Sequence, residues 1–204
     1  AAPQRHLLGG RKARQAGEAW RQRWDSFTFT TPNWAIRLPG AEYQGQDPDG
    51  FLPRDDIIAM FEQYARNLSV RFGVRATAVK RLEAGYIVET DGGPLEAANV
   101  AVATGSFQRP KIPSFSANIP SDVLQLHSGQ YRNPPSLPPG AVLVIGSGQS
   151  GCQIAEELNQ SGRKVFLSVG SAGRAPRRYR GKDIFWWLAA SGFFDRPVDK
   201  LPSP

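Results

Sequence analysis

Six consecutive residues have the types and spacing to hold a phosphate group. They follow the pattern G-x-G-x-x-G, whose glycines allow a backbone to approach a pyrophosphate closely. Gly146 permits a tight turn out of a preceding strand, Gly148 lets the backbone approach the phosphates, and Gly151 lets the following helix pack against that strand. The start of the helix adds free N–H groups and a partial positive charge. The candidate dinucleotide-binding residues are Gly146, Ser147, Gly148, Gln149, Ser150 and Gly151.

The pattern is common by chance, so the elements around it decide its meaning. The apolar run at residues 141–145 predicts a buried parallel strand directly before the loop. Residues 149–161 have the apolar face of a helix that ends at Gly162, and residues 164–169 predict the next strand. This strand–helix–strand unit of about 30 residues is the setting that a dinucleotide site requires. The alternative is a glycine-rich turn that binds nothing.

The residues after the second strand favour NADP over NAD. An NAD site tends to place Asp or Glu about 20 residues beyond the glycine loop, where it holds the ribose 2′-hydroxyl. Residues 168–171 (SVGS) contain no acid. Arginines follow instead, and a guanidinium can hold a 2′-phosphate through two hydrogen bonds. The candidates are Arg174, Arg177 and Arg178, with Arg180 beyond them. The alternative is that these arginines belong to a solvated surface loop.

In the first part of the chain, the predicted helices and strands follow one another less regularly. Residues 53–68 predict a helix, because apolar side chains recur on one face and two acidic residues occupy the first turn. Residues 20–34 are aromatic and Thr-rich, which predicts an extended segment that ends in a turn, and residues 47–50 (DPDG) predict a second turn. The further predicted strands are residues 6–8, 70–74, 78–82, 86–90 and 99–103.

Composition and charge narrow the class of protein. The chain has 204 residues, of which 40% are hydrophobic and 21% charged, and its net charge is +7. These values exclude a disordered chain, and the absence of a run of about 18 apolar residues predicts no membrane span. The basic residues match no nucleic-acid-binding motif. One cysteine and two histidines provide neither a disulfide nor a metal-ligand spacing, and we expect a reduced, cytoplasmic protein.

Pro-rich sequence divides the chain in two. Residues 131–140 contain four prolines and are the best candidate for a domain boundary. We therefore predict two α/β domains, over residues 1–133 and 134–204. Residues 183–188 (DIFWWL) predict a short aromatic helix. We interpret this helix as an insertion that packs over a ligand cleft, and the alternative is a helix lying on a membrane surface.

Several stretches in the same order resemble the flavin-containing monooxygenases, especially their bacterial flavoprotein branch. Residues 17–21 (GEAWR) and 23–26 (RWDS) are similar to the family's sequence after the second strand of the FAD domain. Residues 31–34 (TPNW), 37–40 (RLPG) and 47–51 (DPDGF) resemble the bacterial branch. Residues 103–105 (ATG) resemble the turn that leaves the FAD domain, and residues 127–131 (HSGQY) resemble the end of the family's identifying motif. The resemblance covers residues 17–197.

This resemblance implies an α/β fold with two doubly wound Rossmann-type domains, the first for FAD and the second for NADPH. It implies that NADPH reduces the flavin, which then uses O₂ to oxygenate a small nucleophilic or carbonyl substrate. Asn33 is the implied catalytic side chain near the flavin. The residues expected along the FAD are Gly17, Glu18, Trp20, Trp24, Thr104 and Gly105.

The chain also departs from the family's pattern. A first glycine motif, which would hold the FAD pyrophosphate, is absent before Gly9, and Ser121 and Val123 stand where the identifying motif has Phe and Gly. We therefore expect a partial chain in which both domains are incomplete. A flavin disulfide reductase is an alternative, but that class needs two redox cysteines and only Cys152 is present. The other alternative is a truncated, non-catalytic NADP-binding remnant or interaction module.

Overall fold

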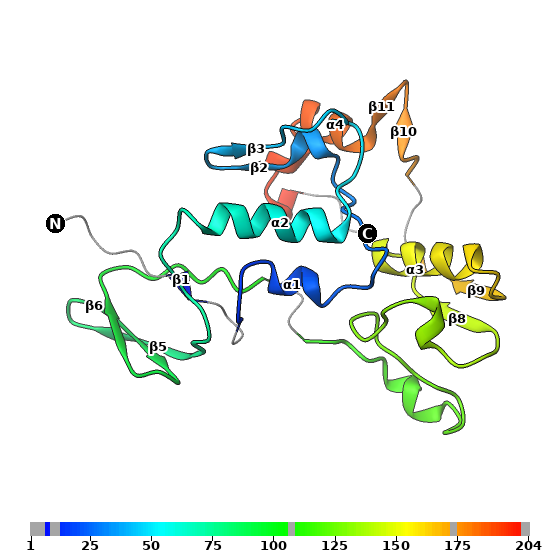
Figure 1. Ribbon diagram of the computed structural model, residues 1–204, viewed down its shortest axis with the longest axis horizontal. Helices are drawn as coiled ribbons and strands as arrows, with labels where there is room; N and C mark the ends of the chain where they lie inside the picture. The colour runs from blue at the N-terminus through cyan, green and yellow to red at the C-terminus, as the bar shows by residue number, and fades with distance from the viewer. Residues whose placement is uncertain (1–6, 9–12, 106–108, 172–174, 201–204) are drawn as a thin grey trace. The chain divides into compact units, whose positions relative to one another are not determined.

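The computed structural model describes residues 7–8, 13–105, 109–171 and 175–200. The chain forms two compact units. Unit 1 comprises residues 1–25 and 54–133, and unit 2 comprises residues 26–53 and 134–204. The backbone therefore passes from one unit to the other three times, and each unit is an α/β arrangement built from segments that are distant in sequence (Figure 1).

Unit 1 combines two small sheets with two helices. β1 (Leu7–Leu8) pairs in parallel with β4 (Val70–Arg71), which confirms the strand predicted near the start of the chain. β5 (Ala76–Leu82), β6 (Gly85–Thr90) and β7 (Leu95–Ala97) form an antiparallel sheet in that order. α1 (Glu18–Arg21) packs against α2 (Arg54–Ala65), and the two helices lie side by side in Figure 1.

The helix predicted at residues 53–68 is confirmed as α2, although it ends at Ala65. Its buried residues are Ile57 and Ile58, and Asp55 and Asp56 lie in the first turn, where the helix dipole favours negative charge. Leu68, which the pattern placed on the buried face, is 40% exposed. The helix therefore ends where its apolar face stops gaining burial.

Two predictions for unit 1 were wrong. Residues 99–103 form no strand, because no strand of the described residues pairs with this apolar stretch, and β7 lies upstream of it instead. The segment predicted to be extended from residue 20 begins inside α1. Gly17 precedes α1 with φ of 75°, a left-handed conformation that glycine adopts at low cost and that turns the chain into the helix.

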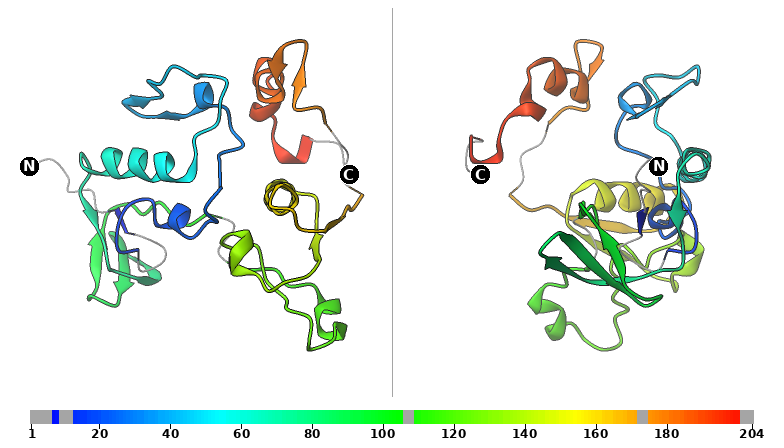
Figure 2. Two further views of the ribbon diagram at one scale, coloured as in Figure 1. Left: turned by 45° about the vertical axis from the view of Figure 1, so that its right-hand side comes forward. Right: turned by 90° about the vertical axis from the view of Figure 1, so that its left-hand side faces the viewer.

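Unit 2 contains the predicted strand–helix–strand unit. β8 (Val142–Ile145) pairs in parallel with β9 (Val165–Ser168), and α3 (Gln149–Gln160) connects them. α3 buries Ile154, Ala155 and Leu158 and packs on both strands; the left view of Figure 2 shows this helix, in yellow, nearly end-on. Ser161 caps α3, and Gly162 follows with φ of 82°, so the predicted helix end is confirmed.

The strand before the loop was predicted to be buried, and its pairing is confirmed but its burial is not. Leu143 is 59% exposed and Ile145 is 53% exposed, whereas Val142 and Val144 are half-buried. Successive side chains of a strand point to opposite faces, and α3 covers only one face of the β8–β9 pair. Within the described residues, the other face is open.

The rest of unit 2 is made of short elements. A 3-10 helix spans Asn33–Ala35, and β2 (Arg37–Leu38) and β3 (Ala41–Glu42) form a hairpin. β10 (Arg178–Tyr179) pairs with β11 (Lys182–Asp183), and α4 (Ile184–Ala190) follows directly, as predicted for the aromatic segment. Nowhere in the described ranges is a helix both long enough and apolar enough to cross a membrane.

Candidate functional site

The glycine loop leaves β8 with an open backbone. Gly146 has φ of 105° and its N–H donates to Ser168 O at 3.0 Å, which holds the loop to the end of β9. A Cβ atom placed on Gly146 or Gly148 would meet nothing within 4 Å. The space over these two residues is therefore free for a ligand that approaches the backbone.

Gly151 has the opposite surroundings. A Cβ atom there would lie 2.0 Å from Gly146 O and 3.6 Å from Val144 Cγ1. Only glycine allows the first turn of α3 to approach the end of β8 this closely, which is the packing role predicted for this position.

The start of α3 offers hydrogen-bond donors. The first helical bond runs from Cys152 N to Gly148 O at 2.9 Å. The N–H groups of Gln149, Ser150 and Gly151 precede it and have no acceptor within the helix. The helix dipole places partial positive charge at the same end. The predicted helix start is thus confirmed, and the arrangement fits an anionic group such as a pyrophosphate.

The arginines expected to bind the 2′-phosphate differ in the contacts that they make. Arg174 lies outside the described residues. Arg177 is engaged within unit 2: its Nε lies 2.8 Å from Asp183 Oδ2, and its Nη2 donates to Thr30 O at 2.6 Å. Its guanidinium also lies 4.4 Å from the ring centroid of Phe51 and 5.6 Å from that of Phe185. Arg177 therefore joins residues 26–53 to the start of α4.

Arg178 is less occupied. It lies in β10 with an exposed side chain, and its contact with Asp49 O is at 3.5 Å, the outer limit of a hydrogen bond. Arg180 is exposed too and lies 5.2 Å from the ring centroid of Tyr179. Among the described residues, Arg178 and Arg180 could each bind a phosphate without breaking an ion pair, and Arg178 is the one of the two named as a candidate from the sequence.

Asp183 was not identified from the sequence as a functional or structural side chain. It is buried, it caps α4 by accepting from Phe185 N at 2.9 Å, and it pairs with Arg177. An Asp just before an apolar run is a typical helix-capping signal, which could have revealed the capping role. The pairing with Arg177 could not be read from spacing alone.

Most of the residues expected along the FAD lie in one short segment of unit 1. Gly17 and Glu18 begin α1, and Trp20 stacks on Phe61 with ring centroids 6.3 Å apart. Trp24 is 1% exposed, so its ring packs in the core rather than presenting a surface. Thr104 and Gly105, also in unit 1, are exposed, and Gly105 has φ of 76°.

Asn33 belongs to unit 2, together with the glycine loop. It is 3% exposed, and its Nδ2 donates to Asp47 O at 2.9 Å while its backbone N–H donates to Gly50 O at 2.9 Å. These bonds hold the predicted turn at residues 47–50, which is confirmed. Among the described residues, Asn33 Oδ1 is buried with no hydrogen-bond partner. A buried amide oxygen of this kind destabilises the folded state unless a bound group donates a hydrogen bond to it.

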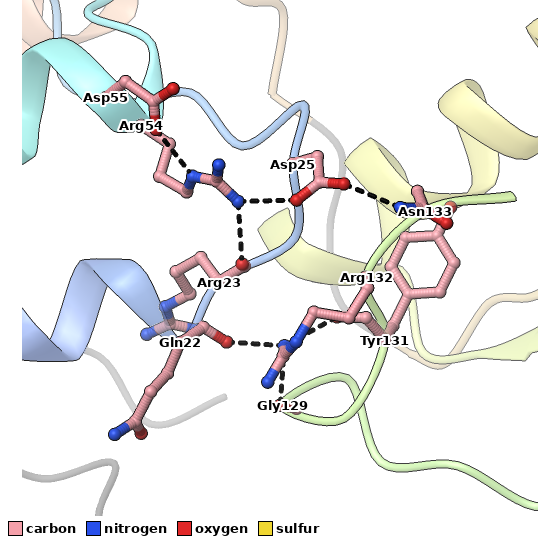
Figure 3. A network of polar contacts seen from close by, with 9 residues as sticks. All are labelled: Gln22, Arg23, Asp25, Arg54, Asp55, Gly129, Tyr131, Arg132 and Asn133. Atoms are coloured by element: carbon pink, nitrogen blue, oxygen red, sulfur yellow. Dashed lines mark hydrogen bonds and ion pairs between the residues drawn. The ribbon is translucent and has the colours of Figure 1, made fainter. Parts of the chain in front are cut away.

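A polar network that sequence analysis missed lies in unit 1 (Figure 3). The carboxylate of Asp25 accepts from Arg54 Nη1 and from Asn133 Nδ2, each at 2.7 Å. Hydrogen bonds from Asn133 and Arg54 lower the pKa of Asp25 below its usual value of 3.8, and Arg132 adds a smaller effect of the same sign. The bond to Asp25 in turn raises the pKa of Arg54.

The residues around the glycine loop match a known protein family. The family model described as pyridine nucleotide-disulphide oxidoreductase matches residues 53–197, which include the glycine loop and both of its strands. The chain belongs to this family. The resemblance seen in the sequence is confirmed at the level of this oxidoreductase family and of the fold.

The chain is similar in sequence to bacterial oxidoreductases and in fold to solved flavin enzymes. An uncharacterized CzcO-like oxidoreductase of Geobacillus kaustophilus is 38% identical over 187 residues, covering 90% of this chain and 53% of the relative. A flavin-containing monooxygenase from Stenotrophomonas maltophilia shares the fold, with a TM-score of 0.71 and 21% identity over 95% of this chain and 63% of that one. The chain spans about half the length of the curated relatives it matches.

The same fold occurs in a second kind of enzyme. The bacillithiol disulfide reductase of Bacillus cereus has a TM-score of 0.69 and 19% identity over 94% of this chain and 59% of that one. At these identities the similarity shows the fold alone. The α/β class is therefore confirmed, with a fold that is similar to those of both solved enzymes.

Proposed function

We propose that this chain is part of an NADPH-dependent flavoprotein monooxygenase. In this proposal FAD and NADPH are the cofactors, and one oxygen atom of O₂ is inserted into a small nucleophilic or carbonyl substrate. The observation that carries the proposal is the open glycine loop at the end of β8, whose Gly148 backbone and α3 N–H groups fit a pyrophosphate. Bound flavin would supply the electron transfer and the activation of oxygen.

The nucleotide would be held mainly by backbone groups. The loop from Gly146 to Gly151 would receive the pyrophosphate, with the side chains of Ser147, Gln149 and Ser150 at its rim. Arg178, together with Arg174, would bind the 2′-phosphate that distinguishes NADPH from NADH. Arg177 would first have to release Asp183 and Thr30, so we assign it a lesser part in nucleotide binding.

Flavin binding is proposed for unit 1, along Gly17, Glu18 and Trp20 and at Thr104 and Gly105. Gly17 has a left-handed backbone and lies against Ile58, where a Cβ would be 3.4 Å from Ile58 Cα, so this glycine has a packing role as well as the proposed one. The buried ring of Trp24 would shape this region rather than touch the cofactor.

Asn33 is the proposed side chain of the reaction centre. Its Nδ2 is committed to Asp47 O, so its chemistry would come from Oδ1, which is buried and accepts no hydrogen bond within the described residues. A positioned amide oxygen can orient an N–H group of a cofactor or substrate without taking part in proton transfer. Replacing Asn33 would therefore remove orientation rather than an acid or a base.

A flavin disulfide reductase is the second candidate, because bacillithiol disulfide reductases share the fold. Reduction of a disulfide by a dithiol needs two cysteines in reach of each other. These 204 residues contain one, Cys152, whose Sγ donates to Ser147 O at 3.3 Å in the glycine loop. We favour the monooxygenase for this reason.

The proposal is tested with the full-length protein. We expect a yellow protein with flavin absorbance, NADPH oxidation that requires O₂, and a preference for NADPH over NADH. A protein that stays colourless after incubation with FAD and does not oxidise NADPH would refute the proposal. NADPH oxidation that needs a disulfide and continues without O₂ would select the reductase instead.

A further inference from the structure

The three connections between the two units meet at one place on unit 1. The backbone leaves or enters unit 1 between residues 25 and 26, between 53 and 54, and between 133 and 134. The residues on the unit 1 side of these connections are Asp25, Arg54 and Asn133. They are up to 108 residues apart in sequence, yet all three contact one another through a single carboxylate (Figure 3).

The two carboxylate oxygens of Asp25 accept hydrogen bonds from residues at the other two connections. Oδ1 accepts from Arg54 Nη1 at 2.7 Å, and Oδ2 accepts from Asn133 Nδ2 at 2.7 Å. The backbone N–H of Asp25 donates to Arg132 O at 2.8 Å, next to Asn133. One short side chain thus ties all three connections together.

Neighbouring contacts strengthen the same assembly. Arg132 Nη1 donates to Gln22 O at 2.7 Å and to Tyr131 O at 2.9 Å, and Arg54 Nη1 also approaches Arg23 O at 3.4 Å. Two large side chains beside the network, those of Trp24 and Tyr131, are almost fully buried. The segments at residues 22–25 and 129–133 are therefore anchored in the packed interior just before they leave unit 1.

The charges around Asp25 keep this network constant over a wide pH range. The groups that face it are Arg54 and Arg132, with Asp55 on the far side of Arg54. Because the pKa of Asp25 is lowered in the folded protein, its contribution is complete above the usual value of 3.8 and is lost as the pH falls through the folded pKa. At neutral pH Asp25 is therefore ionised, and its hydrogen bonds to Arg54 and Asn133 are retained.

We propose that Asp25 restrains the three connections as one assembly, so that loss of its carboxylate loosens all three segments together. The inference concerns contacts within unit 1 and goes beyond the proposed function.

The restraint itself is tested by amide hydrogen exchange on the full-length protein at pH 7, with Asp25→Ala and Asp25→Asn. We expect exchange to rise roughly threefold to fivefold at residues 22–26, 52–56 and 129–134 together, and less in Asp25→Asn, which keeps a hydrogen-bonding side chain. The matched control is Glu89→Gln, which removes an exposed ion pair of the same unit, with Lys80 at 2.5 Å. A rise confined to residues 22–26, or an equal rise at all three segments in Glu89→Gln, would overturn the inference.

Discussion

The glycine loop and the segment from Arg177 to Asp183 lie in the same unit, and the loop and the arginines at 177 and 178 were expected to bind one nucleotide. In the loop, the relevant groups belong to the backbone, and their geometry follows from three glycines and a helix start. In the arginine segment, the relevant groups are side chains, and Arg177 is held by Asp183 and Thr30. A motif whose chemistry lies in the backbone can therefore be predicted from the sequence more directly than the partners of a cluster of like charges.

The largest effect is expected from a substitution within the glycine loop. Gly151→Ala places a Cβ atom 2.0 Å from Gly146 O, and we expect it to lower the free energy of unfolding by about 3 kcal/mol, since backbone on both sides must shift. The matched variant is Gly148→Ala, which meets nothing within 4 Å. It should leave the melting temperature unchanged and raise the Kd for NADPH about tenfold, because its methyl group occupies the approach of the phosphates.

Thermal unfolding and NADPH titration of both variants check this prediction. If Gly148→Ala binds NADPH as the unmodified protein does, the loop does not carry the pyrophosphate. If both variants lose only stability, the loop is a packing feature and the contrast with the arginine segment disappears.

A smaller effect is expected from Asp183→Ala. The change removes the cap of α4 and the partner of Arg177, and we expect a loss of about 2 kcal/mol in unfolding free energy. The loss is limited because the side chain of Arg177 is 41% exposed and solvent screens its charge. Denaturant unfolding measures it, and Asp195→Ala, an exposed acid just after α4, is the control that should change little. Equal losses in the two variants would show that the buried pair has no special role.

The smallest effect concerns nucleotide choice. Arg178→Ala should raise the Kd for NADPH about fivefold, roughly 1 kcal/mol, and leave the Kd for NADH unchanged, because only NADPH carries the 2′-phosphate. Arg177→Ala should instead lower stability with little effect on the ratio of the two affinities, since its guanidinium is held within the fold. Titration calorimetry with both nucleotides decides between them. A change of preference in Arg177→Ala alone would reverse the assignment.

Local patterns account for what the sequence predicted. β8, α3, β9 and α2 follow from apolar periodicity and from glycine positions, which act over a few residues. The turn at residues 47–50 likewise follows from its own composition. Residues 99–103 mislead because they are apolar enough for a strand, but a strand needs a partner that no local pattern supplies.

The contacts of the candidate site were less predictable. Asp183 pairs with a residue six positions away across a hairpin, so its partner depends on the turn between β10 and β11. Asp25 bonds to Arg54 and Asn133, which are 29 and 108 residues away. Such pairs are selected by the tertiary fold, and a basic, Arg-rich chain offers too many equivalent partners for spacing to choose among them.

The separation of residues 26–53 from the rest of unit 2 has a consequence for biosynthesis. Thr28 accepts from Gln153 and Thr30 accepts from Arg177, partners that are 125 and 147 residues downstream. At a translation rate of about 5 to 20 residues per second, the ribosome needs about 7 to 29 s to deliver the second partner. During that interval the nascent segment lacks its downstream contacts, and its apolar side chains stay exposed until residues 153 and 177 have been synthesised.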